Sequence, residues 1–172
     1  MKLNKLFLAG AMAATLFGAC NKDDDDDSGM NDTDRNFMTN ASYSNYNEID
    51  AGTVAVARGS NPAVTSFGSM MQMDHTMAQN ALDSIGDRRN MNLPTGPDQE
   101  HVMLKQMLMT LSGHTFDTAY MNSQVRDHQK TINLFQDEIN NGRDQQVKNF
   151  ASSKLPTIQH HYHMADSIAR NL

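Results

Sequence analysis

The chain has 172 residues, enough for one domain of ordinary size with or without a tail. It has 14 Lys and Arg and 20 Asp and Glu, which give a formal net charge of −6. This charge argues against nucleic acid as a partner, because proteins bind nucleic acid mainly through cationic contacts to its phosphates. The single cysteine excludes an internal disulfide framework and a cysteine-cluster zinc site, and the 14 Met with only 10 Gly and four Pro favour helices over a β-sandwich.

Residues 1–19 are predicted to be a lipoprotein signal peptide. A short basic start is followed by an apolar run over residues 6–17, which is too short for a membrane helix of about 20 residues. The run ends in Gly18-Ala19-Cys20, which resembles the lipobox of bacterial lipoproteins, where that cysteine is lipidated. Phe17 departs from the branched aliphatic residue usual at its place, so a plain secretory signal that leaves a free thiol is the alternative.

Residues 20–32 are predicted to be a solvated tether behind the lipidated Cys20. Residues 23–27 are consecutive aspartates, which repel one another and cannot pack. An acidic run in this place also resembles the surface-export signal of Bacteroidetes lipoproteins, with a simple spacer as the alternative. These segments together predict a cell-envelope protein that is held at a membrane by its lipid anchor. The expected location is the outer membrane, where the domain faces either the periplasm or the cell surface.

Residues 33–172 are predicted to be a helical domain. Caps, glycines and prolines interrupt the chain at residues 61–62, 93–97, 112–113 and 141–144. Between these breaks we expect helices over about 33–58, 62–89, 98–111, 115–141 and 145–171. Apolar residues recur at three-to-four spacing and no segment alternates at period two, so the expected fold class is all-α.

A rough internal repeat indicates how these helices are arranged. Residues 61–67 resemble residues 144–150, and each segment follows a long helix and opens the next. Two such hairpins, joined by a connection that holds the short helix, predict a four-helix bundle with a crossover, which is the layout of ferritin-like proteins.

Candidate metal ligands occur on all of the long helices: Glu48, His75, His128 and His161. At about 1.5 Å per residue, each lies roughly 18–27 Å from the turn that closes its hairpin, near the middle of helices about 42 Å long. The interior of a bundle at that height is where di-metal carboxylate proteins build their site. The common depth predicts that these side chains meet.

Asp74 and Asp127 each precede one of these histidines and are expected in a supporting role. Neighbouring residues point about 100° apart around a helix, so we expect the imidazoles to face inward and the aspartates to orient them. The sequence has no Glu-x-x-His pattern of ferritin-like di-iron proteins. Imidazole with carboxylate favours Fe(II), Zn, Cu or Ni over Mg or Ca, and the sequence leaves the metal open. The alternative is a metal-free polar centre that only fixes helix register, in a structural or protein-interaction domain.

Two further patterns favour simpler interpretations. Met70, Met73 and Met77 share a helical stripe beside His75, and thioethers with imidazole suit Cu(I), but such a stripe is more typical of core packing. Asp117 is expected to act near the N-terminus of its own helix, where its charge suits the helix dipole.

Several short motifs together resemble one bacterial family. They are Met71-x-x-Asp74-His75, Ser112-Gly113-x-x-Phe116-Asp117-x-x-Tyr120, Asp127-His128, and Leu155-Pro156 followed by His161. They are similar to the family called domain of unknown function 4142, over about residues 33–170. The resemblance implies a ferritin-like helical bundle in a secreted or envelope protein, and Glu48 falls where that family tends to have Glu in its first helix.

The family resemblance implies no established activity, and the sequence itself favours a non-enzymatic role. It contains no Ser-His-Asp signature, phosphate loop or nucleotide fingerprint. We therefore expect a non-enzymatic or weakly catalytic metal-binding module that acts in envelope stress or metal handling.

Overall fold

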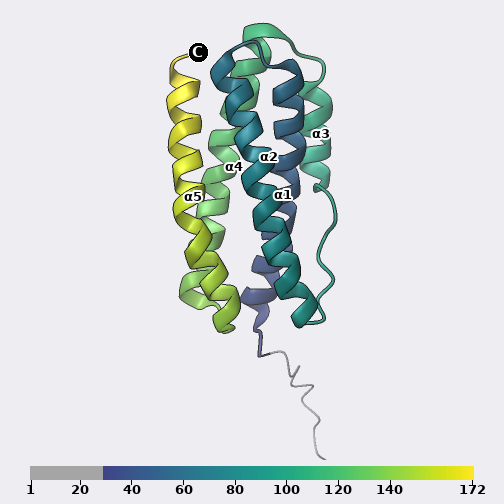
Figure 1. Ribbon diagram of the computed structural model, residues 1–172, viewed down its shortest axis with the longest axis vertical. Helices are drawn as coiled ribbons and strands as arrows, with labels where there is room; N and C mark the ends of the chain where they lie inside the picture. The colour runs from purple at the N-terminus through teal and green to yellow at the C-terminus, as the bar shows by residue number, and fades with distance from the viewer. Residues whose placement is uncertain (1–28) are drawn as a thin grey trace, which may run out of the picture.

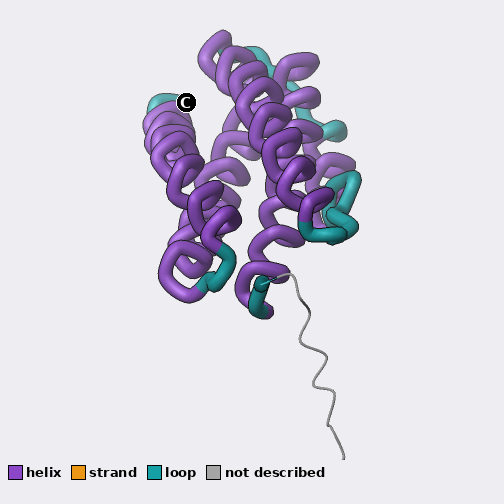
Figure 2. The backbone as a smooth tube through the Cα atoms, turned by 60° about the horizontal axis from the view of Figure 1, so that its bottom comes forward, coloured by secondary structure: helices purple, strands orange, loops and turns teal. Residues whose placement is uncertain are grey.

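The computed structural model describes residues 29–172, so the predicted signal peptide, Cys20 and most of the predicted tether lie outside the described residues. Over this range the chain forms helices and loops without strands (Figure 2). The helices are α1 (Asp32–Arg58), α2 (Pro62–Arg88), α3 (Gln99–Leu108), α4 (Gly113–Asn141) and α5 (Gln145–Arg170). The all-α fold class is confirmed. None of these helices combines the length and apolar character that a membrane span requires.

Side-chain caps explain where the helices begin. At α1, the Asn31 side chain accepts from Asp34 N while Asp34 Oδ2 accepts from Asn31 N, which forms a reciprocal capping box. At α2, the Asn61 side chain accepts from a backbone N–H and Pro62 occupies the first helical turn, where its missing N–H costs nothing. Asp144 caps α5 in the same way. The breaks expected from the sequence are therefore real helix starts.

The helices form a bundle of two antiparallel hairpins, α1 with α2 and α4 with α5 (Figure 1). After α2, the loop and α3 run back along the outside of α1, so that α4 starts at the same end of the bundle as α2. Around the bundle, α1 packs against α2 and α4, and α5 packs against α4 and α2. This arrangement confirms the ferritin-like four-helix bundle with a short crossover helix.

The α1–α2 hairpin is tight because two glycines face each other across it. A Cβ atom at Gly52 would lie 2.7 Å from the carbonyl oxygen of Gly68, and one at Gly68 would lie 2.8 Å from the Cβ of Ala55. Any side chain at either position would push the helices apart. The close approach holds α1 and α2 in a fixed register along the length that carries Glu48 and His75.

The interior has two apolar halves with a polar section between them. The half at the end where α1 begins is built around Phe37, Leu82, Phe135 and Phe150. The other half is built around Val64, Phe67, Phe116 and Tyr120. Between them lies what we call the central polar layer, whose buried members are Asn45, Glu48, His75, Gln79, Gln124, Asp127, His128, Thr131 and His161. Buried polar groups are costly unless they have partners, so this layer is the part of the fold that needs explanation.

Two predictions made from the sequence are wrong. Met70 packs against the core as expected, but Met73 and Met77 do not fill it, because they are 59% and 54% exposed. Asp117 does not act at the N-terminus of its own helix. It is buried and accepts hydrogen bonds from Ser60 N and Asn61 N. A side chain of α4 therefore caps the turn that leads into α2. The single-helix pattern could not show either outcome, because both depend on how helices pack.

Candidate metal centre

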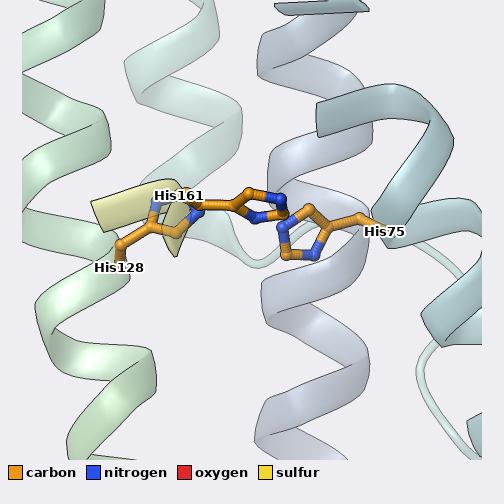
Figure 3. Close-up of side chains that lie close together, drawn as sticks. All are labelled: His75, His128 and His161. Carbon is orange, nitrogen blue, oxygen red and sulfur yellow. The ribbon is translucent and has the colours of Figure 1, made fainter. Parts of the chain in front are cut away.

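Three histidines from three helices meet in the central polar layer. His75 on α2, His128 on α4 and His161 on α5 are 4%, 1% and 1% exposed. Figure 3 shows their rings gathered in one small region. One ring nitrogen of each lies within 4.8 Å of the other two. The expected convergence of these three side chains is therefore observed.

The spacing of the three rings suits a single ion. The ring centres are 5.8 Å apart for His75 and His128, and 5.5 Å apart for each of these with His161. An imidazole nitrogen binds zinc at about 2 Å, which puts its ring centre about 3.2 Å from the ion and the centres of two such rings on a tetrahedral ion about 5.2 Å apart. The observed ring centres are near-equally spaced and lie within about 0.6 Å of that separation.

Each of these histidines has one ring nitrogen occupied by an oxygen acceptor. His75 Nδ1 is 3.0 Å from Asn45 Oδ1, and His128 Nδ1 is 2.9 Å from the carbonyl oxygen of Gln124. His161 Nε2 is 2.9 Å from Asp74 Oδ2. Because carbonyl, amide and carboxylate oxygens accept, the nitrogens that face them carry the proton.

The other nitrogens are therefore bare lone pairs. His75 Nε2, His128 Nε2 and His161 Nδ1 are buried and have no hydrogen-bond partner among the described residues. A buried polar atom left without a partner costs about 1–3 kcal/mol. In metal sites the histidine nitrogen away from the ion characteristically donates to a carboxylate or carbonyl oxygen, and all three histidines follow this pattern.

Burial keeps these imidazoles in the neutral form that a metal requires. Burial lowers the pKa of His75 well below its usual value, and the neighbouring His128 and His161 lower it further. Burial, together with the repulsion that a second positive charge beside His161 would meet, lowers the pKa of His128 to about 4. The pKa of His161 is also lowered by burial, although its hydrogen bond to Asp74 opposes the shift. Ligand lone pairs are thus available at neutral pH without a competing proton.

A chain of side-chain amides fixes the orientation of His75. Asn45 Nδ2 donates to Gln79 Oε1 at 3.1 Å, and Gln79 Nε2 donates to Ser42 Oγ at 2.9 Å and to Asp83 Oδ1 at 2.7 Å. These bonds leave Asn45 Oδ1 facing His75. Asn45 and Gln79 were not predicted from the sequence, where the only available signal was their polar character on the inner stripes of α1 and α2.

Glu48 lies beside this cluster and not among the three bare nitrogens. Its Oε1 is 3.6 Å from His128 Nδ1, the nitrogen that donates to Gln124, while its Oε2 is buried without a partner among the described residues. Burial and the nearby charge of Asp127 raise the pKa of Glu48 to about 8. Glu48 lies at the height of the histidines, as expected. The rotation of α1 about its axis, however, turns the Glu48 carboxyl group toward Nδ1 of His128 and not toward the bare nitrogens.

The two supporting aspartates have different surroundings. Asp74 orients His161 on the opposite hairpin and not its sequence neighbour His75. Asp127 faces α3, where its Oδ2 is 3.5 Å from His101 Nε2. Burial lowers the pKa of His101, but hydrogen bonds with Asp127 and Asp98 outweigh it and raise the pKa to about 9. The crossover helix thus adds a cationic imidazole on the acidic side of the polar layer.

The sequence over residues 21–168 matches the family described as Domain of unknown function (DUF4142). The chain belongs to this family. The DUF4142 domain is also similar in fold to a solved structure described as a DUF305 fragment from Deinococcus radiodurans. The two share 12% sequence identity with a TM-score of 0.74, over 83% of this chain and 99% of that one, which is a likeness of fold alone. No curated protein matches the sequence.

Two pockets reach the centre of this DUF4142 domain from different sides. A pocket of about 280 Å³ between α1, α3 and α4 is lined by Glu48, Asp98, Glu100, His101 and Asp127, among others. A pocket of about 240 Å³ between α2 and α5 is lined by Asp74, His75, Met77 and His161, together with apolar residues. We call them the acidic pocket and the histidine pocket. The histidine pocket gives solvent-borne species a route to His75 and His161, whereas the acidic pocket reaches Glu48 and Asp127.

Proposed function

We propose that the domain binds one transition-metal ion through His75, His128 and His161. The observation that carries the proposal is the triad of bare nitrogens, each on an imidazole whose other nitrogen is tied to an oxygen acceptor. Three neutral imidazoles suit Zn(II), Cu(II) or Fe(II) and offer nothing to Mg or Ca, which prefer oxygen ligands. Asp74 and Asn45 support the site by holding the rings.

We further propose that the domain works as a non-enzymatic or weakly catalytic metal-holding module of a lipid-anchored envelope protein, in envelope stress or metal handling. The support for the anchor is the Gly18-Ala19-Cys20 sequence after an apolar run. Expression of the full chain in bacteria with a labelled fatty acid tests it. Label on the wild type and none on Cys20→Ser supports the anchor, and an unlabelled wild type contradicts it.

Metal analysis of the untagged protein tests the site directly. We expect about one equivalent of Zn, Cu or Fe after purification or reconstitution. Metal that binds only the native state must raise the melting midpoint, by roughly 5–10 °C at a free concentration about 100 times Kd. A stoichiometry near zero for every transition metal, with full helicity, would overturn the proposal.

Matched histidine variants separate this site from incidental metal binding. His128→Gln should abolish the thermal shift, because it removes one of the three lone pairs. His114→Gln, an exposed histidine on the same helix, should leave the shift unchanged. His161→Gln and the exposed His163→Gln form the same pair on α5. Equal losses in both members of a pair would indicate surface binding.

The alternative is a metal-free domain whose polar layer sets helix register. The observation in its favour is the Asn45–Gln79 bond, which joins α1 and α2 independently of any ion. Under this alternative the histidine variants change the melting midpoint equally with and without added metal.

A further inference from the structure

The three histidines leave one position of a four-coordinate ion without a protein ligand. Metal sites that bind an outside molecule characteristically have three protein ligands and one open position. The nearest carboxylates are turned elsewhere: Asp74 Oδ2 is bonded to His161 Nε2, and Glu48 lies beside the protonated nitrogen of His128. Among the described residues, the group that could hold an ion contains only the three histidines.

The histidine pocket is the side from which an outside ligand can reach that position. His75 and His161 both line it, whereas His128 does not. Its volume of about 240 Å³ exceeds the roughly 30 Å³ that one water molecule takes in the liquid. The pocket therefore has room for a ligand of several atoms beside the ion.

The charges around the histidine pocket favour an anion. Three neutral imidazoles leave the full charge of a divalent ion uncompensated, and Lys154 adds a cation to the lining. The one carboxylate of the lining, Asp74, is engaged by His161. Ala78, Phe135 and Ile158 make the remaining wall partly apolar, and a less polar surrounding strengthens the attraction between opposite charges. The acidic pocket differs, since four carboxyl groups line it beside the cations His101 and Lys130.

We propose that the ion keeps an open coordination position toward the histidine pocket and that this position binds a small inorganic anion of a few atoms. The inference rests on the proposed function, because it requires the ion at the three histidines.

Azide titration of the Cu(II)-loaded or Co(II)-loaded protein tests the inference, with the metal content of every sample measured first. Coordinated azide changes the visible absorption of either ion. Lys154→Met should weaken azide binding by about threefold to tenfold, through loss of one nearby charge. Ala78→Phe places a ring in the pocket and should weaken it by about tenfold or more. Both variants should retain one equivalent of metal.

Two controls address the acidic pocket. Lys130→Met removes the same charge from its lining, and Asn40→Phe places the same ring there, at exposed positions. Neither should change the azide affinity by more than about twofold. Equal effects from the two pockets would overturn the assignment to the histidine pocket.

The remaining outcomes distinguish this inference from the proposed function. A protein that binds one equivalent of metal and shows no azide-dependent spectrum overturns the open position alone. A protein that binds no metal overturns the proposed function, and this inference with it. Azide binding that survives both Lys154→Met and Ala78→Phe overturns the route through the histidine pocket.

Discussion

Asp74 on α2 and His161 on α5 are joined by a hydrogen bond of 2.9 Å between Oδ2 and Nε2, so a carboxylate of one hairpin orients an imidazole of the other. The bond fixes the proton on Nε2 and leaves Nδ1 as a buried lone pair without a partner among the described residues. It also crosses the interface between the two halves of the bundle. The histidine cluster therefore depends on the correct docking of the hairpins.

Replacement of Asp74 by Asn should weaken metal binding by about 10-fold to 100-fold, which is typical when a partner of a ligating histidine is lost. The amide oxygen can still accept from Nε2, but it lacks the charge that makes the imidazole a stronger ligand. Competition with a chelator of known affinity measures the change. Asp166→Asn, on α5 in an exposed pair with Arg170, is the control and should have no effect.

His128→Leu should separate metal binding from stability. In the presence of a chelator we expect the free energy of unfolding to stay within about 1 kcal/mol of the wild type or to rise, because leucine has similar volume and removes a buried nitrogen that has no partner. The carbonyl of Gln124 remains inside α4. Addition of metal should then stabilise the wild type alone. A loss of several kcal/mol in chelator would mean that His128 serves packing.

The depth of the site could be predicted from the sequence because a helix rises by a constant amount per residue. The number of residues from each turn predicts that His75, His128 and His161 lie at one height in the bundle. In the structure their side chains meet there. The helix starts were predictable for a similar reason, since Asn61 and Asp144 cap locally and need no tertiary partner.

The rotation of each helix about its axis could not be predicted in the same way. Glu48 has the right depth, yet its carboxylate lies beside the wrong nitrogen of His128, because α1 presents it from the α4 side. Asp74 lies next to His75 in the chain and contacts His161 in space. Such pairings depend on how two helices dock, and the apolar stripe of each helix defines that angle only coarsely.

Replacement of Asp117 by Ala should lower the free energy of unfolding by about 2–3 kcal/mol. The carboxylate is 1% exposed and accepts from Ser60 N and Asn61 N, and both donors would be left without this partner. Chemical denaturation measures the loss. Asp137→Ala, an exposed aspartate later in α4, is the matched control and should cost less than about 0.5 kcal/mol.

Replacement of Glu138 by Gln should stabilise the protein increasingly as pH rises from about 5 to 8. Glu138 is fully buried near the α4–α5 turn, and burial together with the nearby Asp34 raises its pKa from 4.5 to about 8. The unfolded chain releases the proton near pH 4.5 while the folded chain keeps it up to about 8. The wild type therefore loses up to about 1.4 kcal/mol of stability per pH unit across this window, and the neutral amide does not.

Denaturation of both proteins in chelator at several pH values measures that difference. Glu100→Gln, whose carboxylate is exposed on α3, provides the same chemical change at the surface and should give a difference from the wild type that does not grow with pH. If the Glu138→Gln difference were also constant from pH 5 to 8, the Glu138 carboxyl would not keep its proton in the folded protein. Its burial beside Asp34 would then have to be compensated by a cation, for which Lys148 is the nearest candidate.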